Sequence, residues 1–459
     1  MCSPRRSTTH GAGGTCQRRD RSSDGCGKAA ADPPGVPDAV RSTAVDHGPM
    51  TEADTPRIVV AGGGVAGLEA CLALRSFLGE DDLSIDLLCR DKRFEYRPLA
   101  VLEPFDGAPA WSMELERFAA DQDVRLVRDS LAAVEPDRHE AITAYSDRLP
   151  YDALLVCVGA RAVRALPGAI SFRGGRDAAA VRAALDAMQP GDDATIAFAI
   201  PFGAFWTLPL YELAILSAAR LRERGVRARV VMTSPEAVPL EAFGAEASTA
   251  VADLLDARGV EFVARARAIA ADAGELELDD GRRIQARAVI TLPDLVGRRV
   301  PGLRQDAAGF IAVDEHCRVP GAEGVYAAGD VTTFPLKQGG LATQQADTAV
   351  EAMLATLGLP IVPRPFEPVL KGVLYTDREP AYLRATLDGH GSPPRAYAMW
   401  WPPSKIAGRY LAPYLAIRGG APRAPEVRPE HDAIPVTIDI PRAVHAVSNA
   451  LDPSAVPPG

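Results

Sequence analysis

Short apolar runs alternate with longer amphipathic segments along most of this chain, starting at Arg57. The pattern predicts a strand over residues 57–61, a helix over 66–78 and a second strand over 84–89. Such alternation is typical of βαβ units that build a parallel sheet. Residues 151–158, YDALLVCV, form a nearly continuous apolar run, which predicts a further strand that is buried on both faces.

A second block of the same style follows, with strands expected over 195–200 and 228–232 and a helix over 210–224. Residues 309–357 then return to the style of the first block. We therefore predict an α/β protein with two Rossmann-like dinucleotide-binding domains, the second inserted in the first, plus a small C-terminal region. The expected parts are a disordered leader (1–55), the first domain (56–168 and 299–357), the second domain (169–298), a C-terminal domain (358–416) and a Pro-rich tail (417–459).

The first 49 residues lack the continuous apolar segment that a secretory signal requires, and we expect them to be disordered. Met50 stands shortly before the first strand, so it is an alternative translation start. Residues 194–211 carry no charge, but two prolines and a glycine interrupt them. A buried strand, a turn and a helix start explain this stretch better than a membrane span.

Composition and charge exclude several classes of function. The chain has 459 residues, of which 47% are hydrophobic and 24% charged, and its formal net charge is -10. This acidic balance argues against a protein-wide attraction to nucleic acid or to an anionic membrane. The cysteines form no Cys-x-x-Cys pair and the histidines never fall in ligand spacing, so we expect no metal site. Free thiols in a reducing cytoplasm are the simplest interpretation of the cysteines.

A glycine-rich turn lies between the first strand and the first helix. Gly62, Gly64 and Gly67 have the Gly-x-Gly-x-x-Gly spacing. The first glycine allows a tight turn, the second lets a pyrophosphate approach the backbone, and the third lets the helix pack on the strand. The helix N-terminus adds free N–H groups. An acidic residue is expected at the end of the second strand, where either Asp91 takes this role or Arg90 contacts the adenosine part instead.

Two later segments complete a resemblance to a known superfamily. LLVCVGAR ends a strand at Gly159, and GVYAAGDVTTFP ends a strand before Asp330. With the glycine turn, these segments resemble the two-dinucleotide flavoproteins that include type II NADH dehydrogenases, sulfide:quinone oxidoreductases and pyridine nucleotide-disulfide reductases. The resemblance implies an FAD-binding first domain, in which Asp330 binds the ribityl hydroxyls of non-covalent FAD.

The same resemblance separates the branches. Disulfide reductases place a Cys-x-x-x-x-Cys pair after the second strand, where this chain reads DKRFEYRPLAVLEPF without cysteine. Dithiol chemistry at that position is therefore excluded. Tyr96, Arg97 and Pro98 resemble flavin-lining residues of the quinone reductase branches. The cysteines that carry sulfur in sulfide:quinone oxidoreductases are also missing, which argues against sulfide oxidation by that mechanism.

The second domain departs from a nicotinamide site. Its turn reads PFGAFWTLPLYE, with Gly203 as the available glycine and with Phe205 and Trp206 where a pyrophosphate would approach. Thr233 and Ser234 end the next strand, where NAD would require a carboxylate. The turn is similar to the degenerate one of sulfide:quinone oxidoreductases, so NAD(P)H is the less favoured cofactor.

The segment after Asp330, PLKQGGLATQQADTAV, is expected to run from a turn into a helix whose N-terminus points at the flavin. Lys337 would add positive charge there, and Leu341 lies in the first helical turn that binds the cofactor. Gln344 and Gln345 resemble paired glutamines that type II NADH dehydrogenases place near the quinone. Exposed surface positions are the alternative for all three polar side chains.

We interpret the chain as an FAD-dependent oxidoreductase that passes electrons from a small donor to a quinone or another small acceptor. The alternatives are an NAD(P)H:quinone oxidoreductase and a flavin-binding sensor or interaction protein without turnover. We expect a cytoplasmic protein, with peripheral contact at the inner face of the membrane and a homodimer as open alternatives. The apolar segments around Trp400-Trp401 and residues 410–417 would form a ledge for a quinone tail or a dimer partner, or simply pack on the flavin domain.

Overall fold

The structure of the protein is a computed structural model. It describes residues 55–79, 82–191, 194–201, 203, 206–272, 274–386, 395, 399–400 and 402–419. The expected leader and the alternative start at Met50 lie outside these residues, except for residue 55 at the leader's end. Most of the expected tail over 417–459 also lies outside them.

The first sheet has five parallel strands in the order β20-β9-β1-β2-β5. Its strands are β1 (Arg57–Ala61), β2 (Ser84–Leu88), β5 (Arg125–Val127), β9 (Ala153–Val156) and β20 (Val325–Ala327). The helix α1 (Val65–Phe77) follows β1 and packs against α6 (Gly339–Thr356) in one hydrophobic core. β20 pairs with β9 although the whole second sheet lies between them in the sequence.

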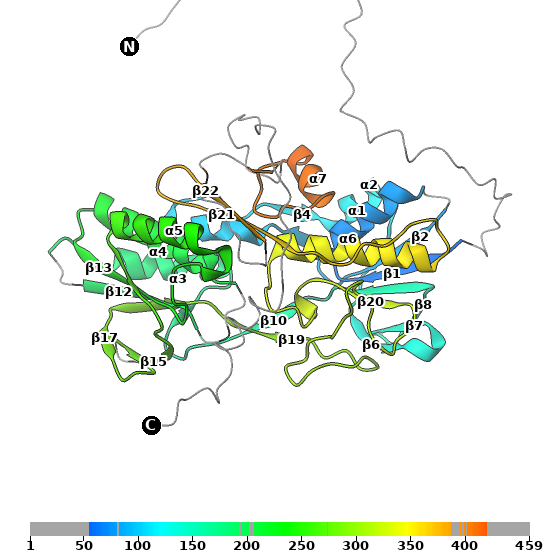
Figure 1. Ribbon diagram of the computed structural model, residues 1–459, viewed down its shortest axis with the longest axis horizontal. Coiled ribbons are helices and arrows are strands. Elements are labelled where there is room, and N and C mark those ends of the chain that lie inside the picture. The colour runs from blue at the N-terminus through cyan, green and yellow to red at the C-terminus, as the bar shows by residue number, and fades with distance from the viewer. Residues whose placement is uncertain are drawn as a thin grey trace, which may run out of the picture. The chain divides into compact units, whose positions relative to one another are not determined.

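The second sheet also has five parallel strands, in the order β11-β18-β12-β13-β14. Its strands are β11 (Ile170–Ser171), β12 (Ala194–Ala199), β13 (Ala228–Thr233), β14 (Val260–Val263) and β18 (Ala288–Thr291). Its helices are α3 (Gly175–Asp186), α4 (Leu208–Glu223) and α5 (Ala245–Arg258). Figure 1 shows this green block beside the blue and yellow elements of the first sheet. The predicted α/β fold with one Rossmann-like unit inserted in another is confirmed.

Short antiparallel pairings surround the two main sheets. β6 (Leu131–Glu135), β7 (Glu140–Thr143) and β8 (Arg148–Pro150) form the excursion between β5 and β9. The others are β3 (Arg93–Glu95) with β4 (Ser112–Glu114), β10 (Ala160–Val163) with β19 (Asp294–Gly297), and β15 (Ala268–Asp272), β16 (Glu275–Leu278) and β17 (Arg283–Gln285) in one sheet. A short helix, α2 (Leu115–Asp121), follows β4.

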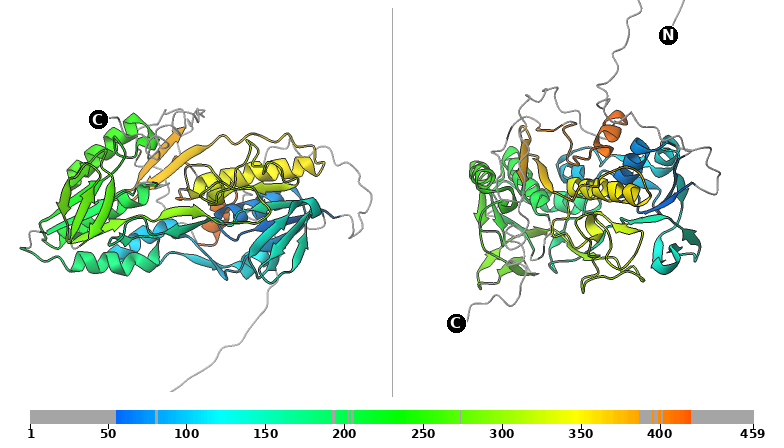
Figure 2. Two further views of the ribbon diagram at one scale, coloured as in Figure 1. Left: turned by 90° about the horizontal axis from the view of Figure 1, so that it is seen from below. Right: turned by 45° about the vertical axis from the view of Figure 1, so that its right-hand side comes forward.

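The C-terminal part contributes a hairpin and a short helix. The hairpin, β21 (Val369–Leu374) with β22 (Ala381–Thr386), contacts α4 through β21 and also α6 (Figure 2). The helix α7 (Leu411–Ile417) packs on α1. The hairpin therefore connects α4, a helix of the second sheet, with α6, which follows β20 of the first sheet. Within the described ranges, no helix combines the length and apolar character needed to cross a membrane.

Candidate functional site

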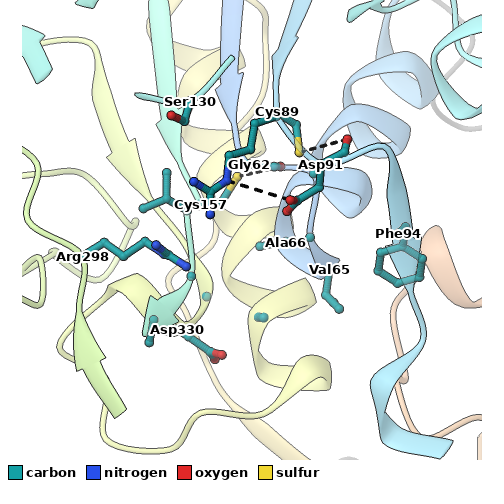
Figure 3. Close-up of a pocket in the computed structure, with 18 of the residues that line it drawn as sticks. Gly62, Val65, Ala66, Cys89, Asp91, Phe94, Ser130, Cys157, Arg298 and Asp330 are labelled. Atoms are coloured by element: carbon teal, nitrogen blue, oxygen red, sulfur yellow. Dashed lines mark hydrogen bonds and ion pairs between the residues drawn. The ribbon is translucent and has the colours of Figure 1, made fainter. Parts of the chain in front are cut away.

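A cleft of about 730 Å³ opens at the carboxyl ends of the first sheet's strands (Figure 3). Open α/β sheets bind ligands at this edge, and the volume falls in the range of small-molecule sites. The cleft is lined by residues 62–66, 88–95, 97–98, 129–131, 157–160, 176, 298–300, 328–330, 339, 342 and 406. It therefore gathers segments from both halves of the first domain.

The glycine turn has the geometry that its spacing predicts. Gly62 has a φ of +133°, and a Cβ there would lie 2.3 Å from the carbonyl oxygen of Cys157. A Cβ on Gly67 would lie 1.8 Å from the Gly62 oxygen, so this glycine permits the close packing of α1. Gly64 faces the cleft, and a Cβ on it would meet nothing within 4 Å. The open space at Gly64 is where an anionic group can approach the backbone.

Two arginines that the motif analysis missed bring positive charge to the cleft. Arg176 is the second residue of α3 and Arg298 follows β19, and neither has an acidic partner among the described residues. Figure 3 shows the Arg298 side chain extending toward the centre of the pocket. No local signal distinguishes these residues from the many surface arginines, because only the fold brings them to the glycine turn. They fit an anionic ligand such as a pyrophosphate.

The other residues predicted at the second strand and its following loop also line the cleft. The Arg90 Nε lies 3.9 Å from the Asp91 Oδ1, and both side chains are largely exposed. Both residues line the cleft, so either remains a candidate for binding the adenosine part of the cofactor. Arg97 and Pro98 stand at the start of a 3-10 helix over Arg97–Phe105. Gly159 has a φ of +69° and open space around its Cβ position.

Asp330 lies in a 3-10 turn over Gly329–Val331 and lines the cleft. Burial raises the pKa of its carboxyl, while the charges of Lys337 and Arg97 act in the opposite direction. Figure 3 shows this carboxylate at the end of the pocket away from Cys89. A half-buried acceptor at this position suits hydroxyl donors of a ligand.

Lys337 and Leu341 are not among the residues that line the cleft in this structure. The Lys337 ammonium donates to the carbonyl oxygens of Thr332 and Phe334 and lies 4.2 Å from the centroid of the Phe310 ring. Burial lowers its pKa to about 8. The Leu341 N–H is capped by the Gln338 side-chain oxygen at 2.9 Å. The residues of α6 that line the cleft are Gly339 and Ala342.

Gln344 is likewise outside the cleft lining, because its amide is engaged elsewhere. Its Nε2 donates to the oxygens of Gly340 and Val369, at 2.8 and 3.0 Å, and its Oε1 accepts the Val369 N–H at 2.8 Å. The side chain therefore fastens β21 to α6. Gln344 is half-buried rather than exposed.

The four described cysteines, Cys71, Cys89, Cys157 and Cys317, are free and buried. Burial raises the pKa of each thiol, to about 12 for Cys71 and Cys317. Burial therefore favours the protonated thiol, which is a poorer nucleophile than the thiolate. No cluster of metal-ligating side chains occurs in the described part of the chain either.

The second sheet carries a carboxylate that the sequence analysis missed. Glu236 follows β13 and is half-buried, and its Oε2 accepts hydrogen bonds from the Tyr211 hydroxyl at 2.6 Å and from the Ser234 hydroxyl at 2.9 Å. Burial raises its pKa to about 7. Thr233 does end this strand, and the carboxylate of Glu236 lies three residues beyond it. Trp206 packs against Phe243, and Phe205 lies outside the described residues.

The C-terminal segment closes one side of the cleft. Ile406 lines it, and its N–H donates to the Tyr96 hydroxyl at 3.0 Å. Trp400 is buried and donates to the Ser404 oxygen at 2.9 Å, so it packs inside the protein rather than on a ledge. Trp401 lies outside the described residues.

Comparisons with known proteins show which family the sequence matches. The sequence matches the family described as pyridine nucleotide-disulphide oxidoreductase over residues 25–178 and 212–353. Sulfide-quinone reductase of Aquifex aeolicus is 24% identical over 301 residues, which are 61% of this chain and 69% of that protein. An NADH dehydrogenase-like protein of Mycobacterium tuberculosis is 26% identical over 292 residues, which are 60% of this chain and 72% of that protein.

A solved structure shares the fold. The sulfide:quinone oxidoreductase of Aquifex aeolicus superposes with a TM-score of 0.65 at 17% identity, covering 74% of this chain and 86% of that chain.

Proposed function

Since this chain belongs to the pyridine nucleotide-disulphide oxidoreductase family, we propose that it is an FAD-dependent oxidoreductase that passes electrons from a small donor to a quinone. The reaction uses no redox-active disulfide. Non-covalent FAD, when bound, supplies the redox chemistry, and the chain binds and orients it. The division into an FAD-binding domain over 56–168 and 299–357 and a second domain over 169–298 is part of this proposal.

The observation that carries the proposal is the fit of the cleft to FAD. The open backbone at Gly64 and the start of α1 would receive the pyrophosphate, with Arg298 and Arg176 as its counter-charges. The half-buried Asp330 would accept hydrogen bonds from the ribityl hydroxyls. Gly339 would present the N-terminus of α6, whose partial positive charge favours negative charge on the ring.

The pair of Glu236 and Tyr211 supports a donor other than NAD(P)H. A dinucleotide site uses the acidic residue after the second strand to bind the ribose hydroxyls. Here two hydroxyls of the chain itself, from Tyr211 and Ser234, occupy the Glu236 carboxylate. An incoming ribose would have to displace both hydrogen bonds inside the protein, which opposes nicotinamide binding.

The proposal of a quinone as the acceptor is supported by the relative from Aquifex aeolicus, which is a sulfide-quinone reductase. The NADH dehydrogenase-like relative keeps an NAD(P)H:quinone oxidoreductase as the alternative. A flavin-binding protein without turnover is the second alternative. The proposal also includes peripheral contact with the inner face of the membrane, where the protein would reach a quinone. A homodimer is a further part of the proposal.

Anaerobic flavin spectroscopy tests donor and acceptor separately. NADH, NADPH and sulfide are each added to the oxidised protein, and a short-chain quinone is added to the protein after photoreduction. We expect NADH and NADPH to leave the visible flavin band unchanged and the quinone to restore it. Rapid bleaching by NADH that Glu236→Gln abolishes would support the NAD(P)H alternative. A reduced protein that the quinone cannot reoxidise would contradict the acceptor.

A further inference from the structure

A single glutamine side chain brackets Asp330. Gln345 lies on α6 and is only 3% exposed. Its Oε1 accepts the N–H of Gly329 at 2.8 Å, and its Nε2 donates to the Thr332 hydroxyl oxygen at 3.4 Å. One amide thus holds the residue before Asp330 and the second residue after it.

The turn around Asp330 needs such support. Gly329 has a φ of +80°, a left-handed conformation that glycine adopts readily and that leaves the chain free to take others. The Thr332 hydroxyl donates back to the Gly329 oxygen at 3.0 Å, and the Thr332 N–H donates to the same oxygen at 3.1 Å. Lys337 donates to the Thr332 oxygen from the other side. Of the residues that hold the turn, Thr332 and Lys337 belong to the turn or to the loop that follows it, whereas Gln345 comes from α6.

The attachment to α6 joins two walls of the cleft. Asp330 lines one side, and Gly339, the first residue of α6, lines another. Because Gln345 sits on the same helix as Gly339, its two hydrogen bonds fix the distance between the helix N-terminus and the Asp330 carboxylate. Buried amides that satisfy backbone groups in this way hold local geometry that the backbone alone does not specify.

We propose that Gln345 is a positioning residue that sets the Asp330 carboxylate against the N-terminus of α6, so that both engage one bound FAD. This inference rests on the proposed function, since it requires FAD in the cleft. It assigns Gln345 a role away from the quinone, in contrast to the role that the resemblance to paired glutamines implied. Gln345 acts through Gly329 and Thr332 and does not line the cleft.

The adjacent Gln344 is a matched control. It has the same chemistry on the same helix, but its amide binds Gly340 and Val369 and makes no contact with the Asp330 turn among its hydrogen bonds. Replacing either glutamine by leucine removes the amide hydrogen bonds and keeps a side chain of similar size. The two variants therefore differ in which part of the structure is released.

The test is the dissociation constant of FAD, measured by titrating the full-length protein after its flavin has been removed. We expect Gln345→Leu to weaken FAD binding by about tenfold or more, and Gln344→Leu to leave it within about twofold of wild type. Equal affinities for Gln345→Leu and wild type would overturn the inference. Equal losses in the two variants would do so too, because they would indicate a general effect on α6.

Gln345→Glu gives a second readout that does not depend on the leucine variant folding. A protonated glutamic acid can both accept from Gly329 and donate to Thr332, whereas its ionised form cannot donate. The ratio of the variant's FAD dissociation constant to that of wild type should fall toward one as the pH is lowered. A ratio that is independent of pH would contradict the role of these two hydrogen bonds. Wild-type protein that binds no FAD would instead overturn the proposed function itself.

Discussion

The Lys405 ammonium lies 2.6 Å from each of the two carboxylate oxygens of Glu212, a residue 193 positions earlier in the chain. Both side chains are buried, with exposed fractions of 7% and 0%. Glu212 lies on α4 and also accepts the Tyr375 N–H at 2.8 Å. This pair therefore ties the second sheet's helix to the C-terminal segment, next to the Ile406 that lines the cleft.

Removing one partner of this ion pair should cost more than removing both. Lys405→Met leaves the Glu212 carboxylate buried without its cation, which should lower the free energy of unfolding by about 3 kcal/mol. The double variant with Glu212→Leu replaces the pair by apolar groups and should regain most of this loss. Urea unfolding of the full chain measures both. A single variant as stable as wild type, or a double variant less stable than the single one, would contradict the account.

Substitutions at Gly64 and Gly67 should separate cofactor binding from folding. Gly64 has an extended backbone and an open Cβ position, so Gly64→Ala should fold as wild type does but bind FAD about tenfold more weakly. A Cβ on Gly67 would strike the Gly62 oxygen, so Gly67→Ala should lower the free energy of unfolding by about 2 kcal/mol. Thermal unfolding of the flavin-free proteins and FAD titration measure the two effects. A Gly64→Ala variant with unchanged affinity would argue that the phosphates bind elsewhere.

Arg298 should contribute an electrostatic share of FAD affinity. Arg298→Gln should weaken binding by about threefold to tenfold at low salt, and the difference from wild type should shrink as salt screens exposed charges. Arg229→Gln is the control, because Arg229 does not line the cleft and pairs with Glu261 on the second sheet. FAD titrations at two salt concentrations provide the measurement. An equal effect of the two substitutions would speak against a specific contact by Arg298.

The pH dependence of stability should reveal the buried Lys337. Its ammonium loses a proton near pH 8 in the folded protein, compared with its ordinary pKa of 10.5. Between these values the unfolded chain binds more protons, so this group makes stability rise with pH, by at most about 1.4 kcal/mol per pH unit. Lys337→Met should lack that rise. Unfolding curves for both proteins between pH 8 and 10.5 give the difference between their free energies of unfolding. A difference that does not change with pH would show that Lys337 does not titrate in this range.

The sequence predicted those parts of the site that depend on local backbone geometry. Gly67 and Asp330 stand in motifs whose spacing relative to a strand end carries their meaning. In the structure a Cβ on Gly67 would strike the Gly62 oxygen, and Asp330 lines the cleft. Arg298 reaches the cleft only because β19 returns from the second sheet, and nothing near it in the sequence signals that path. Glu236 follows Pro235 rather than standing at the end of β13, so a fixed-position search passes over it. Whether such residues reach a site depends on contacts between elements that are far apart in the sequence.

Gln344 and Gln345 also show that the sequence does not reveal the partners of a side chain. Neighbouring residues on a helix point in different directions, and the sequence did not indicate that one would bind β21 and the other the Asp330 turn. Their resemblance to quinone-site glutamines identified the positions but not the partners. The hydrogen bonds of each amide depend on which strand or turn the fold brings alongside.

Flavin content is the most direct test of the central claim. The full-length protein is purified without added cofactor, denatured in acid, and the released flavin is identified by chromatography and compared with the protein concentration. The account predicts FAD, released without cleavage of any covalent bond, at about one molecule per chain once the protein has been incubated with excess FAD. A protein that carries no flavin and does not take up FAD would contradict it.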